Sequence, residues 1–100
     1  MKFAWKNWTG EIVPAIYHHD QSEAWRFLTE DGEPIATITV MLEDAGPPAP
    51  GYLFVKDWSE NEGILAALVA HGYVEDTGKR VPTGWVHAAI VRKLVEPTNG

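Results

Sequence analysis

Apolar and polar residues alternate along most of the first half of the chain, which is the pattern of β-strands. The alternation is clearest over residues 34–42, where apolar side chains at even positions are separated by Thr37 and Thr39. Asp31-Gly32, just before this segment, is the strongest hairpin signal in the chain. Strands are therefore predicted over residues 2–8, 11–19, 23–29, 34–42, 52–58 and 85–95.

One segment has helical rather than alternating spacing. Ser59 and Glu62 have the spacing of a capping box, which predicts a helix start near residue 60. His71 followed by Gly72 predicts the helix end, because glycine readily adopts the left-handed conformation after the last turn. We therefore predict one α-helix over about residues 60–71. Its buried stripe would be Ile64, Leu65, Leu68 and Val69.

These elements predict an α+β fold, in which a twisted antiparallel sheet of five to six strands carries one α-helix packed on one face. A chain of 100 residues predicts a single domain, residues 1–100. Cysteine is absent, so disulfides and thiolate metal sites are excluded. No apolar run is long enough for a signal peptide or a membrane span, which predicts a soluble cytoplasmic protein without membrane contact.

The net charge of -6 is unevenly distributed along the chain. Residues 20–76 contain twelve acidic and two basic side chains, a net charge of -10. The rest of the chain has six basic and two acidic side chains, a net charge of +4. Direct binding to nucleic acid is not expected, because phosphate contacts require clustered lysine and arginine. A basic protein, or a nucleic-acid-binding complex, is the better-matched partner.

Candidate catalytic and metal-binding residues are sparse. His18 and His19 are adjacent on a predicted strand and would point to opposite faces, while His71 and His87 stand alone. The two serines belong to a turn and a predicted helix cap, and no nucleophile motif surrounds them. We therefore predict no catalytic residue, no metal and no cofactor, and a protein that is not an enzyme; a small hydrolase is the most distant alternative.

The acidic residues are the main candidates for a binding surface. If residues 34–42 pair antiparallel with residues 52–56, the turn at 30–33 lies at the same end of the sheet as residues 57–62. Six carboxylates would then form a negative field attractive to a basic groove. The alternative explanation is an ordinary solvated surface with helix-end electrostatics. The predicted partner-binding residues are Glu30, Asp31, Glu33, Glu43, Asp44, Asp57, Trp58, Glu60, Glu62, Glu75 and Asp76.

The five tryptophans divide into two groups by their position in the predicted elements. Trp5 and Trp25 lie on strand faces with other aromatic residues and are predicted to be core. Trp8, Trp58 and Trp85 fall at turns or element ends, where a large ring is often only half covered. Such rings can anchor a protein interface, although they can also fill the thin core of a small domain.

From about residue 10 to 95, the order and spacing of four blocks resemble a small uncharacterised-domain family of phages, plasmids and other bacterial mobile elements. The blocks are DGEPIATITV at 31–40, GYLFVKDW at 51–58, SENEGILAALVAHG at 59–72 and VEDTGKRVPTGW at 74–85. The closing segment, VHAAIVRKL at 86–94, departs from the Tyr-Pro-rich pattern of the family. The family has no agreed activity, so the resemblance implies a biological context rather than a mechanism.

Small acidic proteins of mobile elements are often stoichiometric inhibitors of host defence, among them anti-CRISPR proteins that occupy a DNA-binding groove. By this analogy, the resemblance implies a monomeric phage or mobile-element protein of the host bacterial cytoplasm. Its acidic, DNA-mimicking surface would block a host nucleic-acid-binding complex such as a CRISPR effector. The alternative is a non-catalytic adaptor of phage or plasmid biology that binds its partner through exposed tryptophans.

Overall fold

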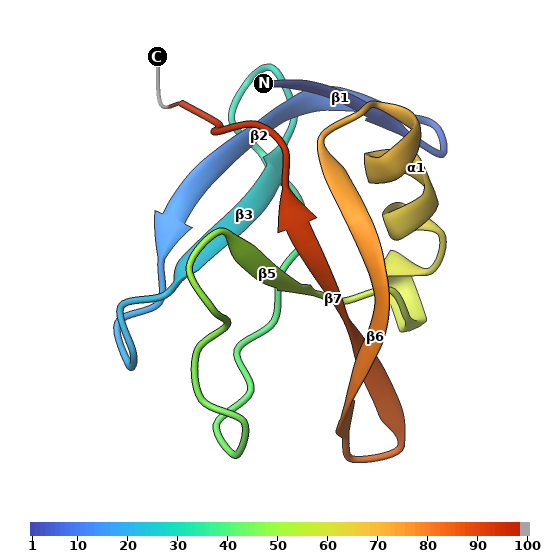
Figure 1. Ribbon diagram of the computed structural model, residues 1–100. Coiled ribbons are helices and arrows are strands. Elements are labelled where there is room, and N and C mark those ends of the chain that lie inside the picture. Colours follow the sequence, from blue (N-terminus) through green and yellow to red (C-terminus); the bar gives the residue numbers. More distant parts are fainter. Residues whose placement is uncertain (99–100) are drawn as a thin grey trace.

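The computed structural model, described here for residues 1–98, contains two antiparallel sheets and one α-helix (Figure 1). Its strands are β1 (Lys2–Trp5), β2 (Trp8–Ile16), β3 (Glu23–Leu28), β4 (Pro34–Thr37), β5 (Tyr52–Val55), β6 (Val74–Thr83) and β7 (Val86–Lys93). The strand orders are β1-β2-β3-β4 and β5-β7-β6. A short 3₁₀ helix, η1 (Ser59–Asn61), precedes α1 (Ile64–Ala70). The α+β class with one α-helix is confirmed, but the strands form two sheets rather than one.

The predicted strand over residues 34–42 is divided because the chain crosses there from one sheet to the other. Regular pairing with β3 ends at Thr37. The Ile38 amide still donates to the Trp25 carbonyl of β3, at 2.9 Å. The Ile38 carbonyl accepts from the Lys56 amide, just beyond β5, at 2.8 Å. One peptide segment therefore joins the edges of both sheets, and this makes the predicted single strand wrong.

Thr39 lies on this crossing and is buried, contrary to the prediction that it points away from the apolar face. Its hydroxyl accepts a hydrogen bond from the Trp25 amide at 3.1 Å and shares another with the Tyr17 hydroxyl at 3.0 Å. Its backbone forms an isolated antiparallel bridge with Val55. The hydroxyl thus gives the Trp25 amide and the Tyr17 hydroxyl a hydrogen-bond partner where the regular strand pairing is interrupted. Because its own polar group is also satisfied, the threonine can be buried.

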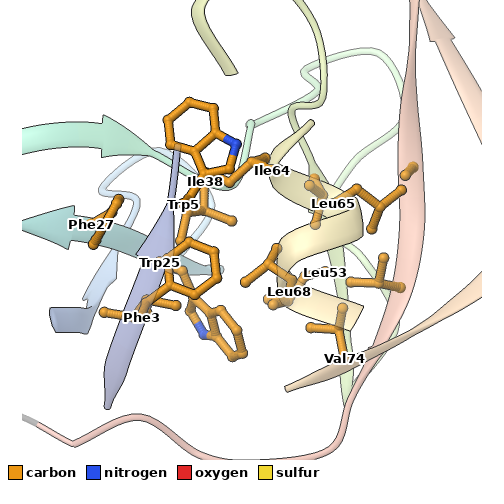
Figure 2. Packing of buried hydrophobic residues seen from close by; sticks show 14 residues of the cluster. Phe3, Trp5, Trp25, Phe27, Ile38, Leu53, Ile64, Leu65, Leu68 and Val74 are labelled. Atoms are coloured by element: carbon orange, nitrogen blue, oxygen red, sulfur yellow. The ribbon is translucent and has the colours of Figure 1, made fainter. Parts of the chain in front are cut away.

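The inner faces of the two sheets and one side of α1 enclose the main core. Figure 2 shows Phe27 and Trp25 on the side of the four-stranded sheet, facing Leu68 and Leu65 of the helix. Burying each such side chain contributes about 1.5–3 kcal/mol. The fully or nearly buried members are Phe3, Trp5, Ile12, Trp25, Phe27, Ile38, Leu53, Val55, Ile64, Leu65, Leu68, Val74, Ala89 and Val91.

The α-helix begins four residues later than predicted, and the capping box is wrong. Gly63 occupies the N-cap position in a left-handed conformation (φ 94°), which separates η1 from α1. Glycine has no side chain that could act as a cap, so Asp57 supplies one from the loop after β5. The Asp57 carboxylate accepts from the Gly63 amide at 3.1 Å and from the Leu65 amide at 3.0 Å. Ser59 lies in η1 with φ 57° and caps nothing.

We expect Asp57→Ala to lower the free energy of unfolding by about 0.5–2 kcal/mol, the usual cost of losing an N-cap acceptor. Ser59→Ala is the matched control and should change it by less than about 0.5 kcal/mol. Thermal unfolding of the two variants, followed by circular dichroism, checks the difference. A larger loss from Ser59→Ala than from Asp57→Ala would restore the capping box.

The predicted end of the helix is confirmed. Gly72 has φ 76°, its amide donates to the Val69 carbonyl, and the Tyr73 amide donates to the Leu68 carbonyl. These two bonds form a Schellman motif. His71 then ties this end to β1, because its Nε2 accepts from the Ala4 amide at 3.3 Å.

The sequence pattern did not predict β6. This strand alternates poorly because it lies at a sheet edge and its pairing with β7 is irregular between Asp76 and Arg80. An ion pair between these two side chains, at 2.9 Å, spans the irregularity. Glu75 also pairs across the strands with Arg92 at 3.1 Å. This edge strand therefore carries two ion pairs in place of a periodic apolar face.

Candidate interaction surface

The predicted carboxylates of the β3–β4 turn are exposed and lie at one end of the molecule. Thr29 shapes the turn, because its hydroxyl accepts from the Glu33 amide at 3.0 Å and its own amide donates to the Glu33 carbonyl. Glu30, Asp31 and Glu33 point their charges into solvent around this hairpin. Figure 1 places the turn at the top of the molecule, close to the N-terminus.

The predicted residues around η1 lie elsewhere, so the expected cluster of six carboxylates does not form. Figure 1 places η1 at the right of the molecule, well below the β3–β4 turn. Asp57 is committed to capping α1, and Glu60 accepts a hydrogen bond from Lys56 that lowers the Glu60 pKa to about 2. Glu62 is exposed. Trp58 is half-buried against a small apolar cluster that includes Phe54.

Two further acidic candidates of this window, Glu75 and Asp76, are paired with arginines from outside it. Hydrogen bonds from Arg80 lower the pKa of Asp76, and the same contact raises the pKa of Arg80. A hydrogen bond to Glu75 raises the pKa of Arg92 in the same way. The charge segregation seen along the sequence is therefore partly cancelled in space.

A third base from outside the window, Lys93 of β7, connects the two sheets through Glu23 of β3. Its Nζ donates to Glu23 of β3 at 2.6 Å and to Glu96 at 2.7 Å. Burial lowers the pKa of Lys93, but the hydrogen bonds to the two carboxylates outweigh burial and leave the pKa raised. The other Glu23 oxygen accepts from the Trp25 indole at 2.8 Å. The charged groups of Lys93, Glu23 and Glu96 have hydrogen-bond partners within this cluster, which suits a structural role.

Within residues 1–98, seven of the predicted carboxylates form no ion pair. One of the seven, Asp57, is used as the cap of α1, so six remain free to meet a partner. They are Glu30, Asp31, Glu33, Glu43, Asp44 and Glu62.

The tryptophans follow their predicted division. Trp5 and Trp25 belong to the core. Trp8 is about half exposed, at 49% of its maximum, and Trp58 is partly buried. Trp85 is completely exposed, at 102%. Because Thr83 pairs with Val86, Gly84 and Trp85 are the two turn residues of the β6–β7 hairpin, and the indole therefore stands at its tip.

A groove lies between residues 41–50 and the outer face of the three-stranded sheet. Leu53 and Val55 point into the main core, so the alternate positions of β5 face outward and form part of the groove floor. The groove has a volume of about 540 Å³. Its apolar lining consists of Ala45, Pro47, Pro48, Ala49, Tyr52, Phe54, Val81 and Ile90, with Thr77 and Lys79 as its polar members.

A second groove, of about 490 Å³, adjoins the first and shares Ala45 and Val81 with it. Residues 41–45 line one side and residues 81–84 line the other. Glu43 and Asp44 bring two exposed carboxylates to this groove. Figure 1 shows the loop of residues 41–50 and the β6–β7 hairpin side by side at the bottom of the molecule. We call this region, with Trp85 at its tip, the hairpin end.

The four histidines do not converge. His18 and His19 lie in the turn after β2 rather than on a strand, His71 holds the end of α1, and His87 is exposed on β7. Among residues 1–98, no three histidine or acidic side chains gather in an arrangement that could hold a metal ion.

Comparisons with protein-family models, with curated proteins and with solved structures found no match to this chain. Over residues 1–98, no helix has the length and apolar character needed to cross a membrane.

Proposed function

We propose that this chain is a non-catalytic protein-binding module that docks on its partner through the hairpin end. The observation that carries the proposal is the complete exposure of Trp85 at the hairpin tip. Indole rings contribute strongly at the centres of protein interfaces, where they fill pockets and exclude water. A fully exposed ring makes no contact that would stabilise this fold, so its benefit lies in binding.

The chemistry around Trp85 supports a partner of defined character. Glu43 and Asp44 line the groove beside the hairpin and have no ion-pair partner within residues 1–98. Unpaired carboxylates next to an apolar anchor favour a partner pocket surrounded by lysine or arginine. The proposed partner is therefore a protein with an apolar pocket and a basic rim, which also agrees with the net charge of -6.

The test is the effect of Trp85→Ser on the affinity for the partner. A photo-crosslinking residue at position 85 identifies the partner in cells, and titration with the purified partner measures Kd. We expect Trp85→Ser to weaken binding about 30-fold, the factor that corresponds to an interface hot spot. Trp8→Ser is the matched control, because Trp8 is also exposed but lies outside the hairpin end, and it should change Kd less than about threefold. An unchanged Kd for Trp85→Ser would reject the proposal.

A second candidate is an anti-CRISPR-type inhibitor that competes with DNA for a basic groove. It is supported by the sequence resemblance and by the free carboxylates of the β3–β4 turn, Glu30, Asp31 and Glu33. For this candidate, neutralising these three residues to amides should weaken binding to a CRISPR effector in competition with its target DNA, and high salt should weaken it further. Glu11→Gln with Glu96→Gln is the control, because both acids already have ion-pair partners. Binding indifferent to salt and to the turn amides would exclude this candidate.

A further inference from the structure

The two grooves of the hairpin end meet at shared lining residues, and together they are called the cleft; its two ends differ in chemistry. At one end, Phe54 and Ile90 form an apolar floor and Pro48 stands in the wall. At the other end, Glu43 and Asp44 supply carboxylates. Ala45 and Val81 line both grooves and mark the point where they meet. An occupant that spans the cleft must therefore be apolar at one end and basic at the other.

The charges of the cleft restrict this occupant further. Lys79 lies beside the apolar end, and within residues 1–98 its ammonium group has no ion-pair partner. It repels a second basic group at that end, so a uniformly basic ligand is disfavoured. The carboxylates at the opposite end attract one lysine or arginine. The order of charges along the cleft thus selects both the composition and the direction of the ligand.

We propose that this cleft binds an extended peptide segment carrying one bulky apolar side chain and, a few residues away, one lysine or arginine. The apolar side chain fills the groove over Phe54 and Ile90, and the basic side chain pairs with Glu43 and Asp44. An extended chain suits a cleft that runs between a loop and the outer face of a sheet. A second copy of this chain is a poor occupant, because two molecules of net charge -6 repel each other.

The inference rests on the proposed function, because it specifies what the partner presents to the hairpin end. The two can fail separately. Trp85 does not line either groove, so Trp85→Ser should retain the peptide while losing the partner.

The experiment selects peptides from a random linear library displayed on phage, using the purified wild-type chain as bait. The selected peptide is then labelled, and fluorescence anisotropy measures its Kd for four variants, one of which is Trp85→Ser. Ala45→Phe places a ring at the junction of the two grooves, and Ala45 is exposed, so the core is untouched. Ala66→Phe, at an exposed position on α1, is the matched control. The double variant Glu43→Lys with Asp44→Lys reverses the charge of the acidic end.

The expected selection is a motif with one bulky apolar residue and one lysine or arginine. Ala45→Phe and the charge-reversed variant should each weaken the peptide at least about tenfold, while Ala66→Phe should leave it unchanged. Repeating the selection on the charge-reversed variant should exchange the basic residue for an acidic one. No enrichment, a motif without a basic residue, or equal Kd values for all variants would overturn the inference. Loss of the selected peptide from Trp85→Ser would also overturn it, because the peptide would then bind the hairpin tip.

Discussion

Replacing Gly10 with alanine is expected to destabilise the fold by about 3 kcal/mol or more, beyond the usual cost of overpacking a core. Gly10 is buried in β2, where the neighbouring β3 passes very close. A Cβ atom at this position would lie 2.0 Å from the Leu28 carbonyl oxygen and 3.2 Å from the Thr29 Cα. Both are backbone atoms, so no side-chain rotation can relieve the clash. Urea unfolding followed by tryptophan fluorescence measures the loss.

Gly32→Ala provides the control for this prediction. Gly32 has φ 88° in the β3–β4 turn, but a Cβ there would meet nothing within 4 Å. Its replacement should therefore cost only the conformational strain, about 1–2 kcal/mol. If Gly10→Ala were no more destabilising than Gly32→Ala, β2 and β3 could not approach as closely as described.

Leu68→Ala is expected to lower the free energy of unfolding by about 2–5 kcal/mol. The Leu68 side chain is fully buried where α1 meets both sheets, as Figure 2 shows, and its removal leaves a cavity that the surrounding strands can only partly close. Chemical denaturation of the purified variant gives the loss directly.

Val69→Ala is the neighbouring control, because Val69 is 44% exposed although the helical pattern predicted it to be buried. It should cost less than about 1 kcal/mol. Similar losses from the two variants would mean that α1 is rotated about its axis relative to the described packing.

The strand assignments show how much of the fold an alternation of apolar and polar residues can predict. It predicted all or part of six strands, most clearly β1 and β2, where the buried residues occupy alternate positions. It missed β6, whose pattern of exposure is governed by its edge position and by pairing with β7 rather than by a buried face. It also could not separate the two sheets, because the crossing at Ile38 continues the alternation through the break.

The start of α1 was mispredicted because capping rules consider only local spacing. Ser59 and Glu62 have the right separation, but Gly63 follows with a left-handed conformation that interrupts the helix. Asp57, six residues before Gly63, then provides the acceptor through space. No spacing rule would have assigned that carboxylate to Gly63 and Leu65.

The candidate surface was only partly predictable. Counting charge along the chain identified the acidic window, but Arg80 and Arg92 return from outside it to pair with Asp76 and Glu75. The groove over the outer sheet face was missed altogether. A signal did exist, because Tyr52 and Phe54 add apolar side chains to the second face of β5, which already has a buried face. A strand apolar on both faces predicts a second covering layer or a binding groove.

The crossing at Ile38 has a consequence for how the molecule melts. The amide of Ile38 belongs to the hydrogen bonding of one sheet and its carbonyl to that of the other. Opening either edge strains the backbone at the same residue, and Lys93 links the sheets a second time through Glu23. We therefore expect neither sheet to remain folded when the other unfolds. The chain should unfold in a single cooperative transition, without a half-folded intermediate.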